Sequence, residues 1–259
     1  MQGLIDTHFH LDMYRNYAEL YKYIDQEKQY TLCVTNSPGV FLSCKRMFGE
    51  SKYIKFALGF HPLEDGLKKK DLDDFMYLLP QTEYVGEIGL DFTRKTGMSK
   101  DKQLEFFDRI VEVCAKNNKI MSVHIRGAEK EVLPIIDRWR PRRCILHWFT
   151  GSLQEQQEFI DLDCYFSINA GMLSNSERIR LIPREKILVE SDGPYSKIDG
   201  KKYQPSYLLR EYELIAKALK EPDLIKLVYS NFKTLLTLQK VNLSVQKTDK
   251  SERHIGASI

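Results

Sequence analysis

His8 and His10 stand one residue apart near the start of the chain, directly behind the apolar pair Leu4 and Ile5. Alternate side chains of a β-strand share one face, so both imidazoles point the same way and can bind one metal ion. Neutral imidazole is the commonest metal ligand among side chains. A pair of ordinary histidines in an edge strand is the alternative. The remaining histidines of the chain favour the metal site.

Further ionisable groups follow other predicted strands. Five of the six histidines lie within or directly after the C-terminal end of a strand, and only His254 does not. In a barrel of parallel strands these ends meet at one face, where the active sites of such enzymes lie. So many ionisable groups at one barrel mouth would repel or desolvate one another unless a cation were bound. The converging groups are His8, His10, His61, Glu87, His124, His147 and Asp192.

Counting the ligands predicts two ions. One ion with five or six coordination positions cannot take four histidines, a glutamate and an aspartate and still leave room for a substrate. Two ions bridged by a carboxylate can share the whole set. The sequence therefore predicts a site for two divalent metals.

The elements that must position these groups alternate along the chain. Eight short apolar strands separated by helices favour a parallel sheet, and eight strands close a (β/α)8 TIM barrel. A doubly wound open sheet is the alternative, but no G-x-G-x-x-G motif opens a helix. After the opening strand around His8, the predicted strands are residues 30–34, 53–59, 84–90, 120–125, 144–148, 164–168 and 187–190.

The helices are predicted from apolar residues at helical spacing and from their caps. Ser99 is expected to cap the clearest helix, which ends near residues 117–118. Ser152 with Glu155, and Ser174 with Glu177, have the spacing of capping boxes that start two further helices. Pro222 is expected in the first turn of the last helix. The other predicted helices are residues 17–28, 41–48, 72–79, 128–139, 207–220 and 224–238.

Length and composition describe an ordinary globular protein. The 259 residues are 42% hydrophobic and 29% charged, with no apolar run of membrane-spanning length and no signal-peptide pattern. Five cysteines without a C-x-x-C pair are expected to be reduced and buried in a cytoplasmic protein. We assign residues 1–241 to one barrel domain and residues 242–259, which are polar and aperiodic, to a flexible tail. A net charge of +3 does not by itself indicate nucleic acid.

Six motifs, in this order, give the chain a specific resemblance to a known family. From about residue 4 to residue 236 the chain resembles the TatD family of metal-dependent DNases, within the amidohydrolase-like barrels. The motifs are Asp6-x-His8-x-His10-x-Asp12, Gly59-Phe60-His61-Pro62, Gly86-Glu87-x-Gly89-Leu90-Asp91, Val123-His124-x-Arg126, His147-x-Phe149-x-Gly151 and Glu190-Ser191-Asp192-x-Pro194-Tyr195.

The resemblance implies hydrolysis of phosphodiester bonds in nucleic acid. The expected activity is a 3′ to 5′ exonuclease on single-stranded DNA, with RNA as a second substrate and Mg²⁺ or Mn²⁺, or else Zn²⁺, as the metal. Position by position, His8, His10 and Asp192 would hold one ion and His124 and His147 the other. Glu87 would bridge the two ions.

The remaining roles follow from the same resemblance and from the chemistry of the residues. Asp192 is the candidate general base, and Glu87 is first a ligand and second a proton acceptor. His61 and Arg126 are expected to hold the scissile phosphate. Phe149 and Tyr195 are expected at the mouth, where they could stack on bases. Three carboxylates are predicted to orient the imidazoles from behind, namely Asp6, Asp91 and Glu190.

Two loops depart from the family pattern and leave the substrate open. After the eighth strand, the expected basic residue and Asn are replaced by the run from Asp199 to Pro205, and the loop after the seventh strand has Met172 to Asn175 in place of a lysine. One alternative function is a hydrolase of small amides, esters or lactones on the same barrel. Another is a subunit that needs partner proteins, because divergent TatD-like proteins also occur in bacterial anti-phage defence operons.

Overall fold

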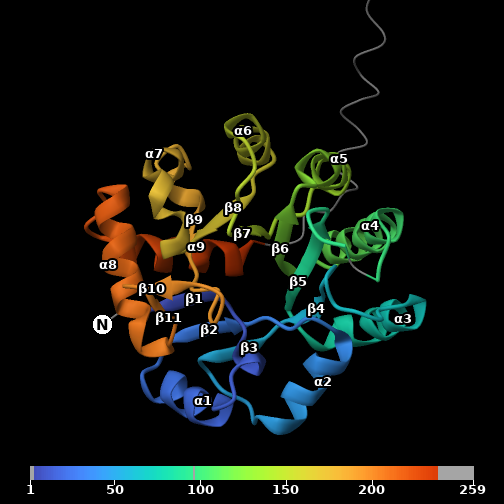
Figure 1. Ribbon diagram of the computed structural model, residues 1–259, viewed down its shortest axis with the longest axis horizontal. Coiled ribbons are helices and arrows are strands. Elements are labelled where there is room, and N and C mark those ends of the chain that lie inside the picture. Colours follow the sequence, from blue (N-terminus) through green and yellow to red (C-terminus); the bar gives the residue numbers. More distant parts are fainter. Residues whose placement is uncertain (1–2, 96, 239–259) are drawn as a thin grey trace, which may run out of the picture.

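The computed structural model describes residues 3–95 and 97–238. Strands form a ring at the centre of the molecule, and helices surround the ring (Figure 1). The chain is therefore an α/β protein with the (β/α)8 barrel that the alternation predicts. No helix within the described residues is both long enough and apolar enough to cross a membrane. The predicted tail, residues 242–259, lies outside the described residues.

Neighbouring strands of the ring pair in parallel. One sheet has the order β1-β2-β3 and the second runs from β4 to β9. The chain after β9 closes the ring against β1, because the backbone N–H of His10 donates to the carbonyl of Gly193 at 2.9 Å. The strands are β1 (Ile5–Phe9), β2 (Tyr30–Cys33), β3 (Ile54–Phe56), β4 (Leu58–Phe60), β5 (Tyr84–Asp91), β6 (Ile120–Arg126), β7 (Cys144–His147), β8 (Tyr165–Ile168) and β9 (Ile187–Val189).

The third predicted strand, residues 53–59, is divided in the structure. β3 pairs with β2, and β4 pairs with β5, so the chain changes partners at Ala57. The side-chain hydroxyl of Thr35 donates to the carbonyl of Ala57 at 2.9 Å and accepts from the backbone N–H of Gly59 at 3.1 Å. A Cβ at residue 59 would come within 1.5 Å of the carbonyl oxygen of Thr35, so only glycine fits this crossing.

The helices form the outer layer. α2 and α3 begin earlier than predicted, and the other ends differ by a few residues. The helices are α1 (Tyr17–Gln26), α2 (Pro38–Met47), α3 (Lys69–Leu78), α4 (Lys100–Lys116), α5 (Glu129–Trp139), α6 (Leu153–Asp161), α7 (Ser176–Ile179), α8 (Leu208–Leu219) and α9 (Leu224–Thr237).

The predicted helix starts are confirmed in two cases and wrong in two. The hydroxyl of Ser99 accepts from the backbone N–H of Lys102, and Ser152 and Glu155 form a complete capping box. The box at Ser174 is absent, because residues 170–175 form a 3-10 helix, in which the side chain of Asn169 accepts from the backbone N–H of Gly171. Pro222 precedes α9 instead of lying in its first turn, since that helix starts at Leu224.

The hydrophobic core lies between the strands and the helices around them. Ile88 and Leu90 of β5 and Phe107 and Val111 of α4 are all buried in it. The five cysteines are buried free thiols, as expected for packing residues. α9 lies behind the ring in Figure 1, beneath the barrel.

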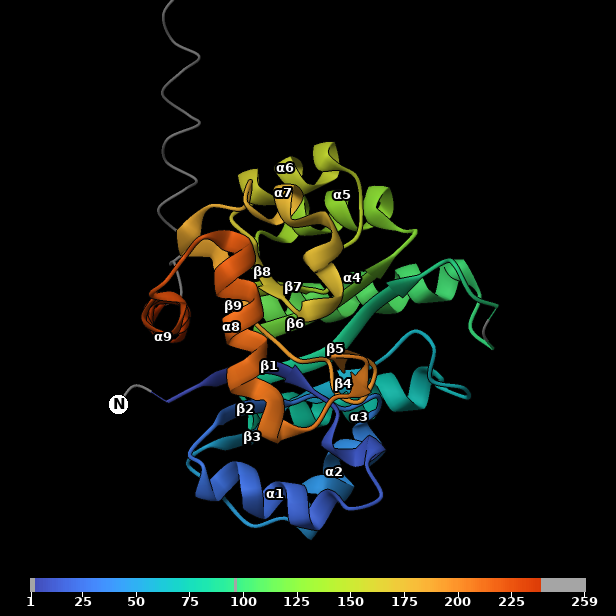
Figure 2. The ribbon, with the colours of Figure 1, turned by 60° about the vertical axis from the view of Figure 1, so that its left-hand side comes forward.

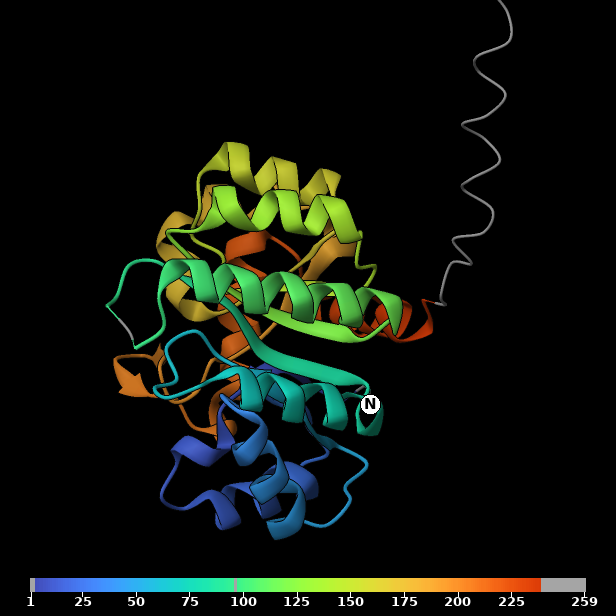
Figure 3. The same ribbon diagram turned by 90° about the vertical axis from the view of Figure 1, so that its right-hand side faces the viewer.

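The loops that follow the strands lie together on one side of the barrel. Figure 3 shows this side at the left, where the loop between β5 and α4 extends beside the orange hairpin. That hairpin consists of β10 (Lys197–Ile198) and β11 (Lys201–Lys202), which pair antiparallel. The hairpin lies beside β1 in Figures 1 and 2, and its Ile198 belongs to the same hydrophobic cluster as Phe9 at the end of β1. These loops form the rim around the strand ends that carry the predicted site.

Candidate metal centre and active site

Glu87 lies in the middle of β5, and one oxygen of its carboxylate faces β1. Its Oε2 is 3.2 Å from Nε2 of His10 and 3.5 Å from Nε2 of His8. Asp192, which follows β9, places Oδ1 3.5 Å from Nε2 of His10 and 3.6 Å from Nε2 of His8. The His-x-His pair therefore shares one face of the strand end and meets two carboxylates.

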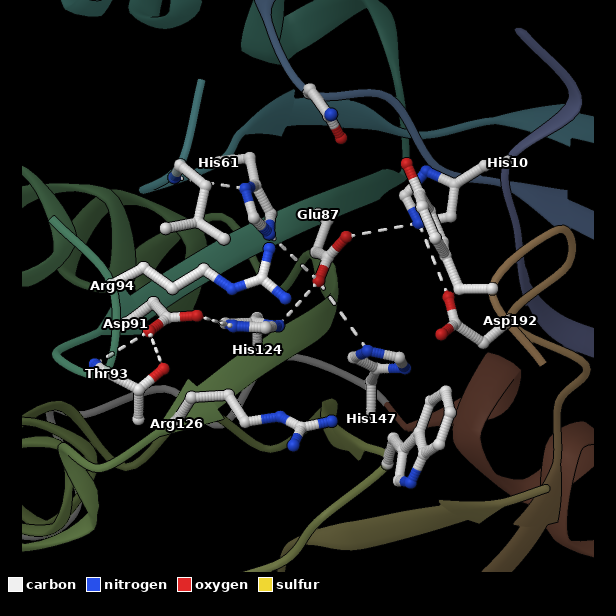
Figure 4. A pocket seen from close by; sticks show the side chains of 14 residues that line it. His10, His61, Glu87, Asp91, Thr93, Arg94, His124, Arg126, His147 and Asp192 are labelled. Carbon is white, nitrogen blue, oxygen red and sulfur yellow. Dashed lines mark hydrogen bonds and ion pairs between the residues drawn. The ribbon is translucent and has the colours of Figure 1, made fainter. Parts of the chain in front are cut away.

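The other oxygen of the Glu87 carboxylate faces three more histidines (Figure 4). Its Oε1 is 2.9 Å from Nδ1 of His124, 3.2 Å from Nε2 of His61 and 3.6 Å from Nε2 of His147. Glu87 is 3% exposed. A buried carboxylate thus divides its two oxygens between two groups of imidazoles, which is the arrangement of a bridging ligand.

The ring nitrogen that faces away from Glu87 has a different kind of partner in His61 than in His124 and His147. Nδ1 of His61 accepts the backbone N–H of Leu63 at 3.1 Å, so in the neutral ring the proton must lie on Nε2. Nε2 of His61 is then a hydrogen-bond donor toward Glu87 and has no lone pair for a metal. By contrast, Nδ1 of His147 lies 3.0 Å from the Glu190 carboxylate, which leaves its Nε2 free as a ligand.

His124 has the same arrangement with its ring nitrogens exchanged. Nε2 of His124 lies 3.1 Å from Oδ2 of Asp91, so its Nδ1 is the atom that faces Glu87. The other oxygen of Asp91 accepts from the backbone N–H and the hydroxyl of Thr93, at 2.9 and 2.6 Å. Asp91 therefore orients an imidazole as predicted, and Thr93 fixes Asp91 in turn.

Glu190 is a buried acceptor for several donors at once. Its Oε1 accepts from His147, from the backbone N–H of Trp148 at 3.0 Å and from the side-chain amide of Asn169 at 2.9 Å. The hydroxyl of Ser167 donates to Oε2. Glu190 is fully buried, so these donors are what stabilises its charge. The predicted role of orienting an imidazole agrees with this geometry.

Asp6 does not contact an imidazole, which corrects the role predicted for it. Its carboxylate accepts from the backbone N–H groups of His8, at 3.2 Å, and Ser191, at 2.9 Å, and from the Ser191 hydroxyl at 2.6 Å. It therefore ties β1 to the segment that carries Asp192. Nδ1 of His8 instead lies 2.7 Å from the hydroxyl of Ser122, a residue that sequence reasoning missed. Ser122 precedes His124 by two in a strand, a spacing that places both on one face.

Close backbone approach explains a glycine beside the site. Gly89 lies in β5 with φ at +151°, and a Cβ there would come within 1.9 Å of the carbonyl oxygen of His124. Glycine alone permits this contact between β5 and β6. The contact brings the strand of Glu87 close to the strand of His124.

The charges of the cluster are strongly coupled. Burial, together with the charge of His147, lowers the pKa of His8 to about 3, so this ring is neutral. Burial opposes the charge of His10, yet hydrogen bonds to Asp192 and Glu87 raise its pKa to about 10. Burial also opposes the charged form of His147, but the nearby carboxylates of Glu190 and Asp192 raise its pKa to about 9. Burial works against the ionised form of Glu87, but the surrounding imidazoles hold its pKa well below the usual range.

The donor set fits divalent metal ions. Three groups each place one atom per residue within 4.8 Å of the others, namely His8–His10–Asp192, His8–Glu87–His147 and His61–Glu87–His124, and in the third group His61 meets Glu87 as a hydrogen-bond donor. Nε2 of His8 is 3.2 Å from Nε2 of His10. Two ligand atoms about 2.1 Å from one ion, at tetrahedral or octahedral angles, are about 3.0 to 3.4 Å apart. Imidazole and carboxylate ligands suit Zn²⁺ and Mn²⁺ in particular.

A cavity of about 410 Å³ opens directly above these groups. Tyr195 borders it and is 56% exposed, as expected of a residue at the mouth. Its lining residues are His10, Asn36, His61, Leu63, Glu87, Asp91, Thr93, Arg94, His124, Arg126, His147, Trp148, Asp192 and Tyr195. Leu63, Thr93 and Asn36 were not among the predicted site residues.

The prediction that Phe149 lies at the mouth is wrong. Phe149 is 2% exposed and packs against Phe159 and Phe166. Trp148 has φ at +37°, a left-handed conformation that breaks the strand alternation after His147. The aromatic ring that borders the cavity is therefore that of Trp148, and Phe149 is turned into the core.

The barrel and the buried cluster of imidazoles and carboxylates define a metal-dependent hydrolase. Residues 5–237 match the family model described as TatD related DNase. The chain therefore belongs to the TatD family of metal-dependent hydrolases.

Curated relatives and solved structures agree with this assignment. The chain is 29% identical over 270 residues to an uncharacterized metal-dependent hydrolase of Buchnera aphidicola, covering 91% of this chain and 99% of the relative. It is 29% identical over 176 residues to the 3′-5′ ssDNA/RNA exonuclease TatD of Citrobacter rodentium, covering 61% of this chain and 66% of that enzyme. The crystal structure of YJJV, a TatD homologue of Escherichia coli K12, superposes with a TM-score of 0.78 at 20% identity, covering 91% and 98% of the two chains.

Proposed function

We propose that the protein hydrolyses phosphodiester bonds of nucleic acid at a site for two divalent ions, and that it acts as a 3′ to 5′ exonuclease on single strands. The observation that carries the proposal is the divided carboxylate of Glu87, whose two oxygens face separate groups of imidazoles. The direction and the single-strand preference rest on the similarity to the 3′-5′ ssDNA/RNA exonuclease of Citrobacter rodentium.

Each predicted ligand has a place in this proposal. His8, His10 and Asp192 would hold one ion, His124 and His147 the other, and Glu87 would bridge them. His61 is left out of the ligand set, because its Nδ1 accepts the N–H of Leu63. Mg²⁺ or Mn²⁺ is proposed as the working metal, with Zn²⁺ as the alternative. When bound, the ions would lower the pKa of a water molecule and polarise the phosphoryl oxygen.

The protein side chains then move the protons. The water oxygen bonds to phosphorus, and the P–O bond to the sugar oxygen of the leaving nucleotide breaks. Asp192, at the edge of the cavity, takes the proton of the water as general base. The sugar oxygen takes up a proton from solvent water as it leaves, and Asp192 returns its proton to solvent. Nε2–H of His61 donates to the phosphate, and Tyr195 at the mouth is placed to stack on a base.

Degradation of an end-labelled strand tests the proposal. Chelator-treated protein should not shorten single-stranded DNA or RNA, and restored Mg²⁺, Mn²⁺ or Zn²⁺ should produce stepwise shortening from the 3′ end. Glu87→Ala and Asp192→Asn should be inactive with every metal. Glu105→Gln, which changes an exposed carboxylate on α4, should match the wild type.

Two results would decide against the proposal. Shortening that continues in chelator would exclude the metal mechanism. Intact DNA and RNA, with metal bound, would instead favour the small-molecule hydrolase or a complex with partner proteins, such as an anti-phage defence system.

A further inference from the structure

Arg94 and Arg126 line the cavity on the side of β5 and β6. Arg126 is the last residue of β6, and the backbone N–H of Phe92 donates to its carbonyl at 2.8 Å. Arg94 lies two residues after Phe92, in the loop that follows β5. Figure 4 shows both side chains extending past His124 toward the middle of the cavity. Two guanidinium groups therefore enter the site side by side, one from the end of β6 and one from the loop that follows β5.

Neither guanidinium group has a hydrogen bond or ion pair with any side chain of the described residues. Asp91, the carboxylate that lies next to them in the cavity, is occupied by His124 and Thr93. The guanidinium of Arg126 lies 5.6 Å from the centroid of the Trp148 ring, a cation–π contact that supports it from one side. Six arginines elsewhere on the protein have carboxylate partners, namely Arg109, Arg138, Arg140, Arg143, Arg184 and Arg210, whereas others, such as the exposed Arg46, form no ion pair with the described residues.

Charge counting indicates that the scissile phosphate needs at most one of these two cations. Two divalent ions would carry four positive charges, and four carboxylates at the site offset them, namely Glu87, Asp91, Glu190 and Asp192. A phosphodiester adds one negative charge, so the two arginines would leave the filled site with a surplus of about one positive charge. A second phosphate group of the substrate would reduce this surplus, and the planar fork of arginine matches its oxygens.

We propose that Arg94 and Arg126 form a subsite for a second phosphate of the substrate, adjacent to the scissile one, so that Arg126 contacts this phosphate and not the scissile one expected from the sequence. This inference rests on the proposed nuclease function and makes it more specific. The subsite takes either a terminal phosphate monoester or the next phosphodiester of the strand. The cavity of about 410 Å³ is in the range of small-molecule pockets, so it suits a nucleotide at a strand end.

Short substrates that differ by one phosphate test the subsite. The set is a dithymidine with a single internal phosphodiester, the same dinucleotide with a 3′-phosphate, the same with a 5′-phosphate, and the trinucleotide. We expect one of the two phosphorylated dinucleotides to have a kcat/KM at least tenfold above that of the unphosphorylated dithymidine. A trinucleotide that reaches the same value would identify a diester as the ligand, and a slower trinucleotide would identify a monoester. Equal values for all four substrates would overturn the proposal.

The variants use the ratio between substrates as the readout. In Arg94→Gln the advantage of the second phosphate should fall below about twofold, whatever the absolute rate. Arg46→Gln removes an exposed charge from the last turn of α2 and should keep the wild-type ratio. An unchanged ratio in Arg94→Gln would overturn the assignment.

A binding measurement separates this inference from the nuclease function. Calorimetry in chelator should give the phosphorylated dinucleotide an affinity at least tenfold above that of the parent, and Arg94→Gln should remove the difference. If the wild type cleaves neither these short substrates nor any longer strand, the nuclease proposal fails. The ratio of the two binding affinities then decides by itself whether the subsite exists. Equal affinities would refute the subsite even if cleavage is observed.

Discussion

Oε1 of Glu190 lies 3.0 Å from Nδ1 of His147 and 3.0 Å from the backbone N–H of Trp148. One buried oxygen therefore fixes the orientation of a proposed metal ligand and of the next residue, which borders the cavity. Because Nδ1 of the ring is held by Glu190, Nε2 is the nitrogen that can offer a lone pair to a metal once the ring has lost its extra proton. This relationship makes the carboxylate of Glu190 a positioning group for the metal site.

Glu190→Gln should weaken metal binding without removing a ligand. The amide cannot accept from all the donors that now converge on the carboxylate, and one of its own N–H groups would face another donor. We expect metal affinity to fall about 10- to 100-fold and the free energy of unfolding of the metal-free protein to fall by about 1–3 kcal/mol. Competition with a chromogenic chelator and urea unfolding measure the two effects. Wild-type metal affinity in this variant would contradict the positioning role.

His61 and His124 should respond differently to removal. His61→Ala should keep the wild-type metal content and lose about 100-fold in kcat, because a hydrogen-bond donor to the substrate is lost. His61→Gln, whose amide can still donate, should retain more activity than His61→Ala. His124→Ala should lose bound metal, because Nδ1 of His124 faces Glu87. The amount of metal that remains bound after dialysis distinguishes the two variants. If His61→Ala binds one metal ion fewer per chain than the wild type, His61 is a ligand.

The strand ends made much of the site predictable. A histidine or carboxylate after a short apolar strand is recognisable in sequence, and the barrel brings those ends together whatever the loops do. For that reason His10, His61 and Asp192 were predicted as converging groups from their positions, together with His8 and Glu87 within their strands. Glu190 was also predicted to orient an imidazole, as a carboxylate at a strand end.

The predictions were wrong where the backbone conformation of one residue, or a single contact between distant residues, determines the local structure. Trp148 adopts a left-handed conformation that turns Phe149 inward, and strand periodicity does not contain that information. The division of the third strand depends on a contact between Gly59 and Thr35, which are distant in sequence. Partners such as Asn169 were missed because polar residues on strand ends and loops are common and carry no spacing signal.

Metal affinity should rise with pH. In the metal-free protein the pKa of His10 is raised to about 10 and that of His147 to about 9, so both rings are protonated at neutral pH. A ligand must be deprotonated, so each metal binding event displaces protons, and a higher pH makes that displacement easier. Apparent affinity should increase up to about tenfold per pH unit for each proton displaced between pH 6 and 9. Chelator competition across this range measures the slope, and a flat profile would contradict protonated ligands.

A buried glutamate away from the metal groups should make stability depend on pH. Glu211 of α8 is fully buried; its Oε1 accepts the backbone N–H of Ala170, and its Oε2 has no partner among the described residues. Burial raises its pKa from 4.5 to about 9; the hydrogen bond from Ala170 opposes this shift, and the charges of Asp6 and Glu190 add to it. Between these two values the folded state binds more protons than the unfolded state.

The free energy of unfolding should therefore fall as pH rises through this window, by up to about 1.4 kcal/mol per pH unit from this group. Glu211→Gln cannot ionise and should remove that slope, so that the variant is more stable than the wild type at pH 8 by at least about 1 kcal/mol. Urea unfolding in chelator at pH 5.5, 7 and 8.5 measures the difference. Glu213→Gln, an exposed neighbour on the same helix, should follow the wild-type profile. Parallel profiles for Glu211→Gln and the wild type would show that Glu211 is ionised in the folded protein.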